Sequence, residues 1–223
     1  MGNTLTNNKL VSRYAFINKT VNNIYIDNNI NEFPVNIESV LKGFANIKVK
    51  NYSDLMLDFN LTASQTIKYL SSEDGCCVKR VSDNRFIIFI NDLTYTSDSR
   101  KLWTVVHELG HIVLNHADIN ISNYSESEIY EFKEHEANYF TSLFLAHPVV
   151  LKEIAIRSAR DIEVFCNLSK EAANYRYKSY KSYKSKGFLR ASDKIIIENF
   201  KKFIEEKNND YIEYKNFMNA FYF

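Results

Sequence analysis

The sequence predicts an α+β fold, in which a small sheet packs on one buried helix and a helical region follows. Residues 76–81 and 86–90 are two strand-like runs joined by a polar turn, which is typical of a hairpin. Residues 98–114 carry apolar side chains on nearly every side, as expected of a helix inside a core. Beyond Pro148 the apolar residues recur at helical spacing, so that part is predicted to be helical.

The chain of 223 residues is long enough to bury a sizeable core. We expect an N-terminal segment packed on the core (1–31), a core (32–148) and a C-terminal helical region (149–223). The sequence has no run of 18 apolar residues and no export signal, so we expect a cytoplasmic protein without a membrane span. Its three cysteines do not form a disulfide framework, which fits a reducing compartment.

Several elements are expected before the hairpin. Residues 1–31 are rich in asparagine but interleave apolar residues, which predicts a partly helical segment that packs on the domain. A proline in the first turn and a glycine after the last mark a short helix over 35–43. Alternation over 45–50 predicts a strand, and Thr62 is suited to cap a helix that runs to Leu70.

The second strand of the hairpin, residues 86–90, is apolar at every position. Such a run is expected of a strand that is covered on both faces, so we place it beside the buried helix. Thr96, Ser97 and Asp98 are the candidate caps for that helix. Gly110 inside it costs about 1 kcal/mol relative to alanine, and close approach by a neighbouring backbone is the expected reason for it.

The buried helix contains the motif His107-Glu108-Leu-Gly-His111. Helical residues four apart share a face about 6 Å apart along the axis, so both imidazoles can reach one metal ion. Glu108 lies beside them and can take a proton from a metal-bound water. Two histidines and a glutamate buried without partners would cost several kcal/mol, which a metal and its water offset. The motif therefore indicates a zinc hydrolase, and the competing interpretation is a chance match in a core helix.

A third ligand is expected from a second helix over residues 125–145. A carboxylate is favoured because, together with the carboxylate of the motif, it balances the charge of Zn²⁺. We choose Glu134, because Asn138 follows one helical turn later and can hydrogen-bond a ligand. Glu131 and Glu136 remain alternatives for the same role. The competing interpretation for each of these glutamates is a solvated acidic face.

Two strings of residues, 100–111 (RKLWTVVHELGH) and 134–140 (EHEANYF), resemble the ImmA/IrrE family of metallopeptidases. The resemblance covers residues 32–180 and is most specific in these two strings. The sequence departs from the family pattern at two positions. His147 stands where these proteins often have a proline, which leaves the end of the second helix open, and Trp103 replaces a usual phenylalanine.

The resemblance implies a zincin-like minidomain, with a small antiparallel or mixed sheet packed on the helix that carries the motif. In this fold an edge strand above the motif helix accepts an extended peptide by strand addition, and Phe86–Ile90 would be that strand or its neighbour. The resemblance also implies that His107, His111 and Glu134 bind zinc and that Glu108 is the general base.

For the function, the resemblance implies a cytoplasmic zinc endopeptidase that cleaves one regulatory protein. The expected substrate is a helix-turn-helix repressor of a phage or another mobile element, which would be derepressed by the cleavage. One alternative is a non-catalytic regulator of the same fold that binds DNA or a repressor. Another is a component of a toxin–antitoxin pair. The oligomeric state is not predicted.

The tetrahedral intermediate of such a reaction needs a second hydrogen-bond donor besides the metal. The candidates are His116, Tyr124, Tyr139 and Tyr175, and the competing interpretation for each is a structural role. His135, which follows the chosen third ligand, is predicted to be a surface residue.

In the C-terminal region, residues 162–183 read as two short helices joined by a tight turn that ends at a Ser169 cap, which resembles a helix-turn-helix. Residues 170–190 hold seven basic residues against one acidic residue, interleaved with tyrosines. This segment is a candidate nucleic-acid contact, or a solvated basic face whose tyrosines pack inward. A further helix is predicted over 192–206, and the aromatic residues of 211–223 are expected to fold back or to bind a partner.

Overall fold

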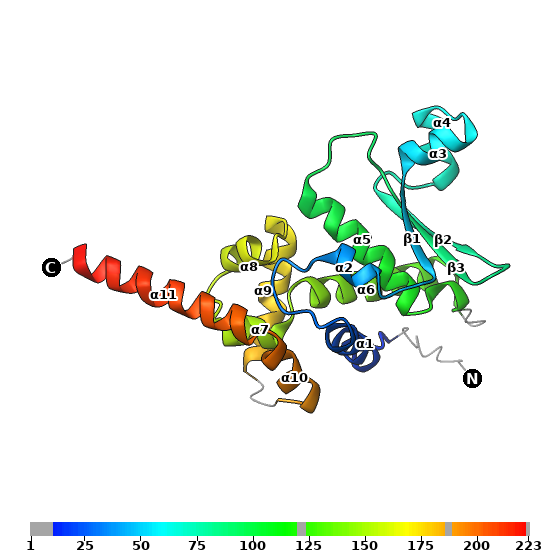
Figure 1. Ribbon diagram of the computed structural model, residues 1–223. Helices are drawn as coiled ribbons and strands as arrows, with labels where there is room; N and C mark the ends of the chain where they lie inside the picture. Colours follow the sequence, from blue (N-terminus) through cyan, green and yellow to red (C-terminus); the bar gives the residue numbers. More distant parts are fainter. Residues whose placement is uncertain (1–10, 120–123, 186–188, 222–223) are drawn as a thin grey trace, which may run out of the picture.

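The computed structural model describes residues 11–119, 124–185 and 189–221. In this part of the chain there are eleven α-helices, one 3-10 helix and a three-stranded mixed sheet, so the predicted α+β class is confirmed. The sheet lies toward one end of the molecule and the C-terminal helices lie toward the other (Figure 1). Among the described helices, none combines the length and the apolar composition that a bilayer crossing requires.

The sheet has the strand order β1-β3-β2, in which β1 is Ile47–Asn51, β3 is Arg85–Ile90 and β2 is Gly75–Arg80. The central strand β3 pairs in parallel with β1 and antiparallel with β2. It is apolar because it is covered on both faces, and Ile88 at its centre is fully buried. The strand predicted over 86–90 is therefore not an edge of this sheet. It is the neighbour of β2, which is an edge.

The motif helix α5 (Asp98–Val113) packs against the sheet, as predicted for the apolar strand and the buried helix. Leu109 and Ile112 of α5 share a cluster with the inward-facing side chains of β3. Of the three candidate caps, Ser97 is the residue that caps α5, and its hydroxyl accepts a hydrogen bond from the backbone N–H of Arg100.

The second helix of the site, α6 (Glu126–Leu145), packs along α5. A capping box at Ser125 begins it, and it ends two residues before His147. His147 takes over the N-cap of the next helix, α7 (Pro148–Glu153), and its Nε2 lies 2.9 Å from Oδ1 of Asn22. Ala146 is the C-cap of α6, and the buried His147 begins the next helix, so the second helix of the site ends at Leu145.

The elements before the hairpin agree in part with the predictions. Helix α1 (Tyr14–Asp27) buries one apolar face against α6 and the C-terminal region, whereas residues 1–10 of the predicted segment lie outside the described residues. Helix α2 (Ile37–Leu41) begins at an Asn36 cap, and Thr62 caps α4 (Ala63–Leu70) as predicted. Helix α3 (Tyr52–Phe59), which follows β1 directly, is not among the predicted elements.

The C-terminal region contains the predicted helix-turn-helix arrangement, formed by α8 (Ala159–Cys166) and α9 (Lys170–Lys184). Asn167 in the left-handed conformation ends α8, and Ser169 caps α9. Within the basic segment, residues 186–188 lie outside the described residues.

The prediction of a single helix over 192–206 is wrong, because this segment forms two successive helices, α10 (Ala191–Asn199) and α11 (Lys201–Phe221). Phe200 sits at the break and is fully buried against Tyr25 and Phe33, so packing on the core interrupts the helix. Helix α11 extends away from the body of the molecule (Figure 1). The largest cluster of buried apolar side chains runs from α1 through α6 and α7 to α10 and the start of α11.

Candidate metal centre

The structure brings three of the predicted site residues to one point between α5 and α6. Nε2 of His107 and Nε2 of His111 are 3.0 Å apart. Each nitrogen also lies 3.3 Å from a different carboxylate oxygen of Glu134. One ligand atom from each of the three residues can be chosen so that all lie within 4.8 Å of one another. The two elements that carry these residues therefore form one candidate site.

The donor set fits a zinc ion. Histidine nitrogens and carboxylate oxygens bind Zn²⁺ at about 2.0–2.2 Å, and two ligands on a tetrahedron of that size are roughly 3.3 Å apart. The observed separations of 3.0 to 3.3 Å match this spacing. Two imidazole nitrogens and a carboxylate are also the ligand types that zinc hydrolases use. The three side chains could therefore hold the ion that the sequence predicts.

The two alternative third ligands lie elsewhere. Glu131 is exposed on α6 and is outside the group of candidate ligands found among the described residues. Glu136 is fully buried and faces away from the cluster toward Arg13 and His116, to which it is hydrogen-bonded. The helical spacing explains the separation, because residues 134 and 136 lie about 200° apart around the axis of α6. His135 is exposed, as predicted.

Hydrogen bonding shifts the ionisation of the cluster. The two imidazoles hold the pKa of the Glu134 carboxyl well below its ordinary value of 4.5. For His107, burial lowers the pKa, but the carboxylates of Glu134 and Glu108 outweigh burial and the net shift is upward. The side chain of Asn138 adds to this upward shift, so it lies close to His107, on the helical turn that the sequence predicted for it.

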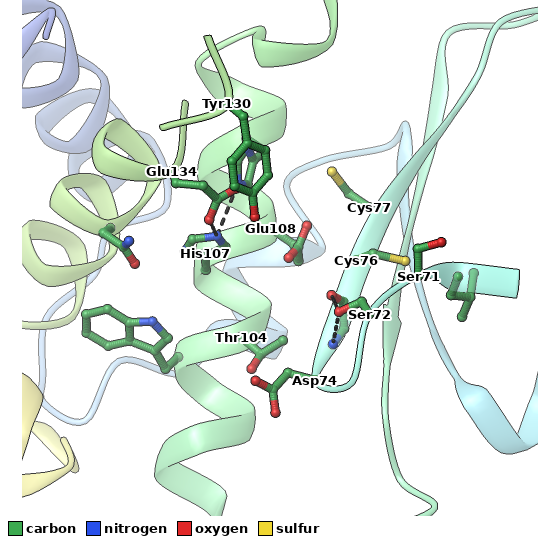
Figure 2. Close-up of a pocket in the computed structure, with 15 residues that line it drawn as sticks. Ser71, Ser72, Asp74, Cys76, Cys77, Thr104, His107, Glu108, Tyr130 and Glu134 are labelled. Carbon is green, nitrogen blue, oxygen red and sulfur yellow. Dashed lines mark hydrogen bonds and ion pairs between the residues drawn. The ribbon is translucent and has the colours of Figure 1, made fainter. Parts of the chain in front are cut away.

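Glu108 follows His107 on α5 but points toward the sheet (Figure 2). Its side chain is largely buried and lies against Cys77 of β2, and this burial raises the pKa of Glu108 above 4.5. A carboxylate of raised pKa is a stronger base than an exposed one. Glu108 is therefore placed beside the candidate metal ligands without being one of them.

A cleft of about 540 Å³ opens over the cluster. Its walls are the β2 edge with the preceding loop, the motif helix and one face of α6 (Figure 2). Gly75 lets β2 sit directly on α5, because a Cβ at this position would be 2.7 Å from Cγ2 of Thr104 and 2.6 Å from the carbonyl oxygen of Phe89. A second hollow of about 270 Å³ lies on the other side of His111 and Glu134.

None of the four candidate oxyanion donors lines the main cleft in the described part of the chain. Both ring nitrogens of His116 have partners, Nδ1 with His111 and Nε2 with Glu136, so this residue has no donor to offer a substrate. Tyr139 accepts a hydrogen bond from Asn18 on α1 and packs on α1, away from the cleft.

Tyr130 is one of the cleft residues that the sequence did not predict. It lines both hollows, and its ring points into the cleft on the side of Glu134 (Figure 2). It precedes Glu134 by four residues on α6, so the two side chains share a helix face. That spacing from the third candidate ligand is a signal by which the sequence could have indicated Tyr130.

The fold and the site together define a metallopeptidase-like domain, in which a histidine pair and a carboxylate from the next helix face a cleft under a sheet edge. The chain belongs to the family of IrrE N-terminal-like domains, peptidase family M78, whose sequence profile matches residues 64–178. The match covers slightly more than half of the chain and runs from α4 to α9. The family predicted from the sequence is thus confirmed. No curated protein matches the chain.

Proposed function

We propose that this protein is a zinc-dependent endopeptidase that cleaves one regulatory protein, a helix-turn-helix repressor of a phage or another mobile element. The observation that carries the proposal is the cluster of His107, His111 and Glu134, whose donor atoms have the spacing of zinc ligands. Glu108 stands beside the cluster, and the cleft is open to a polypeptide. Membership of the M78 peptidase family supports the same reaction.

In the proposed reaction, bound zinc would polarise the scissile carbonyl and acidify the attacking water. Glu108 accepts the proton of that water and later delivers it to the leaving amine. Burial raises the pKa of Glu108 above its ordinary value, which makes the carboxylate a stronger base. Tyr130, which lines the cleft, would donate a hydrogen bond from its phenol O–H to the developing oxyanion.

The substrate segment would bind to β2 in an extended conformation. β2 is an edge strand that lines the cleft, so its free backbone groups can pair with an added strand. An extended segment has to come from a linker or a locally unfolded part of the substrate, because a folded helix does not offer free strand groups. We infer that the cleaved bond lies in such a segment and that the reaction takes place in the cytoplasm.

The number of zinc ions bound per chain tests the proposed metal site, on which the proposed reaction depends. After loading with zinc and removal of excess, the wild-type chain is expected to hold one ion per chain, and Glu134→Gln is expected to lose most of it. Glu131→Gln is the matched control, because it makes the same change at an exposed position of the same helix. Equal zinc retention by the two variants, or none in the wild type, would remove the proposal.

We also propose that the exposed lysines of the basic segment of α9 contact the phosphates of DNA. Arg176 is buried and donates from Nε to the carbonyl oxygen of Ala146, which removes it from the surface. Lys178, Lys181 and Lys184 are exposed. Three phosphate contacts would give a salt dependence of DNA affinity with a logarithmic slope of roughly −3. Filter binding over a salt series tests this, and a flat response would leave these lysines as a solvated face.

A further inference from the structure

A series of hydrogen-bonded side chains begins at Nδ1 of His111, on the side of the ring opposite the nitrogen that faces the ligand cluster. Nδ1 of His111 lies 2.9 Å from Nδ1 of His116, and Nε2 of His116 lies 3.2 Å from Oε2 of Glu136. His116 is 2 % exposed and Glu136 is fully buried. The sequence suggested His116 as an oxyanion donor and Glu136 as an alternative third ligand. In the structure both residues belong instead to this hydrogen-bonded series.

The hydrogen-bonded series continues from Glu136 to Arg13, which is the N-cap residue of α1. The guanidinium donates to Glu136 from Nε at 3.0 Å and from Nη2 at 2.6 Å, and the backbone N–H of Arg13 donates to Oε1 at 2.6 Å. Nη2 also donates to the carbonyl oxygen of Leu114, just after α5, at 3.1 Å. A buried carboxylate is costly without a counter-charge, and Arg13 supplies it.

These contacts allow one assignment of protons that suits a metal ligand. Nε2 of His111 faces the ligand cluster and must be free of a proton to bind a metal. Its proton therefore sits on Nδ1 and is donated to Nδ1 of His116. Because Nδ1 of His116 accepts, this ring carries its own proton on Nε2 and donates it to Glu136. With these tautomers, each hydrogen-bond donor of the series from His111 to Glu136 faces an acceptor.

We propose that His116, Glu136 and Arg13 are positioning residues that fix the tautomer and ring orientation of the metal ligand His111. This inference rests on the proposed zinc site. Metal-bound histidines generally depend on such partners, and their loss weakens metal binding by about 10-fold to 100-fold. The consequence is that α1, which lies outside the matched family region of 64–178, is part of the metal centre.

The test is a zinc-chelator competition at fixed pH on the full chain, comparing His116→Leu and Glu136→Gln with the wild type. His147→Leu is the matched control, because His147 is also a buried histidine with a side-chain partner but lies away from the cluster. We expect zinc affinity to fall 10-fold to 100-fold in His116→Leu, less in Glu136→Gln, and to stay within about 2-fold in His147→Leu. Equal affinities in His116→Leu and the wild type would overturn the inference.

A second measurement does not depend on whether the variants fold. Nitrogen NMR of the zinc-loaded wild type, with labelled histidine, reports which ring nitrogen carries each proton. We expect Nδ1–H at His111 and Nε2–H at His116, and any other pair of tautomers overturns the inference. If the wild type binds no zinc, the proposed function falls as well. If it binds zinc and only the predicted differences are missing, the proposed function stands and the positioning role does not.

Discussion

Gly110 of α5 lies directly against Phe140 of α6, and a Cβ at position 110 would be 2.9 Å from Cδ1 of that ring. The same Cβ would be 3.6 Å from the Cα of Ala137, so the two helix backbones approach closely at this point. Gly110 stands between the two motif histidines in the sequence of α5, and Ala137 follows Glu134 by three residues on α6. We therefore expect this contact to set the distance between the two halves of the candidate metal site.

Gly110→Ala is expected to push α6 away from α5. A methyl group in this contact costs about 1–3 kcal/mol of overpacking, against about 1 kcal/mol gained in helix propensity. We expect a net loss of about 0–2 kcal/mol in the free energy of unfolding. We also expect a fall of about 10-fold in zinc affinity, because Glu134 moves away from the histidines.

Urea unfolding and chelator competition measure the two effects of Gly110→Ala. The double variant Gly110→Ala with Phe140→Leu makes room for the added methyl and is expected to recover part of the lost zinc affinity. If the single variant binds zinc as tightly as the wild type, this contact does not set the geometry of the site.

Acid is expected to destabilise the metal-free protein through Glu136. Burial alone would raise the pKa of this carboxyl, but hydrogen bonds from His116 and Arg13 lower it to about 2. Because the folded-state pKa is below the ordinary 4.5, ionised Glu136 stabilises the fold above that pH. This contribution, at most about 3 kcal/mol, is lost as the pH falls from 4.5 toward 2.

Urea unfolding at several pH values between 3 and 6 checks this expectation. Glu136→Gln should be less stable than the wild type at pH 6, and the difference should shrink toward pH 3. Glu131→Gln, on the exposed face of α6, serves as the control for the change of charge and should follow the wild type. A difference between Glu136→Gln and the wild type that does not vary with pH would contradict the ionisation of Glu136.

Tyr130→Phe is expected to slow the chemical step without weakening substrate binding. The variant keeps the ring in the cleft and removes the proposed oxyanion donor, so kcat should fall about 100-fold while KM stays nearly unchanged. Steady-state kinetics on the cleaved substrate measures both constants. Tyr95→Phe is the control, because Tyr95 is 99 % exposed and lies outside the cleft. An unchanged kcat in Tyr130→Phe would assign the oxyanion to another group.

The sequence predicted the elements whose signals are local. The apolar run of β3 and the Thr62 cap of α4 follow from periodicity and capping. The sequence suggested a neighbouring backbone as the reason for Gly110, whereas its closest neighbour in the structure is the ring of Phe140. The choice of Glu134 over Glu136 followed from the spacing to Asn138, and the structure groups Glu134 with the motif histidines.

The features that the sequence did not predict depend on contacts between distant parts of the chain. The break at Phe200 arises because this ring packs on Tyr25, about 175 residues earlier. The role of Glu136 is visible only when Arg13 is placed beside it, 123 residues away in sequence. The start of helix α3 carries a local signal in the sequence, the capping-box pair Asn51 and Asp54.

The most direct measurement is cleavage of a helix-turn-helix repressor, the proposed substrate, by the zinc-loaded wild type and by Glu108→Gln. The variant keeps the three candidate ligands and removes only the base, so it should hold zinc like the wild type and cleave at least 100-fold more slowly. We expect the wild type to cut the repressor at one site in an extended segment. Cleavage by Glu108→Gln at the wild-type rate would contradict the proposed mechanism.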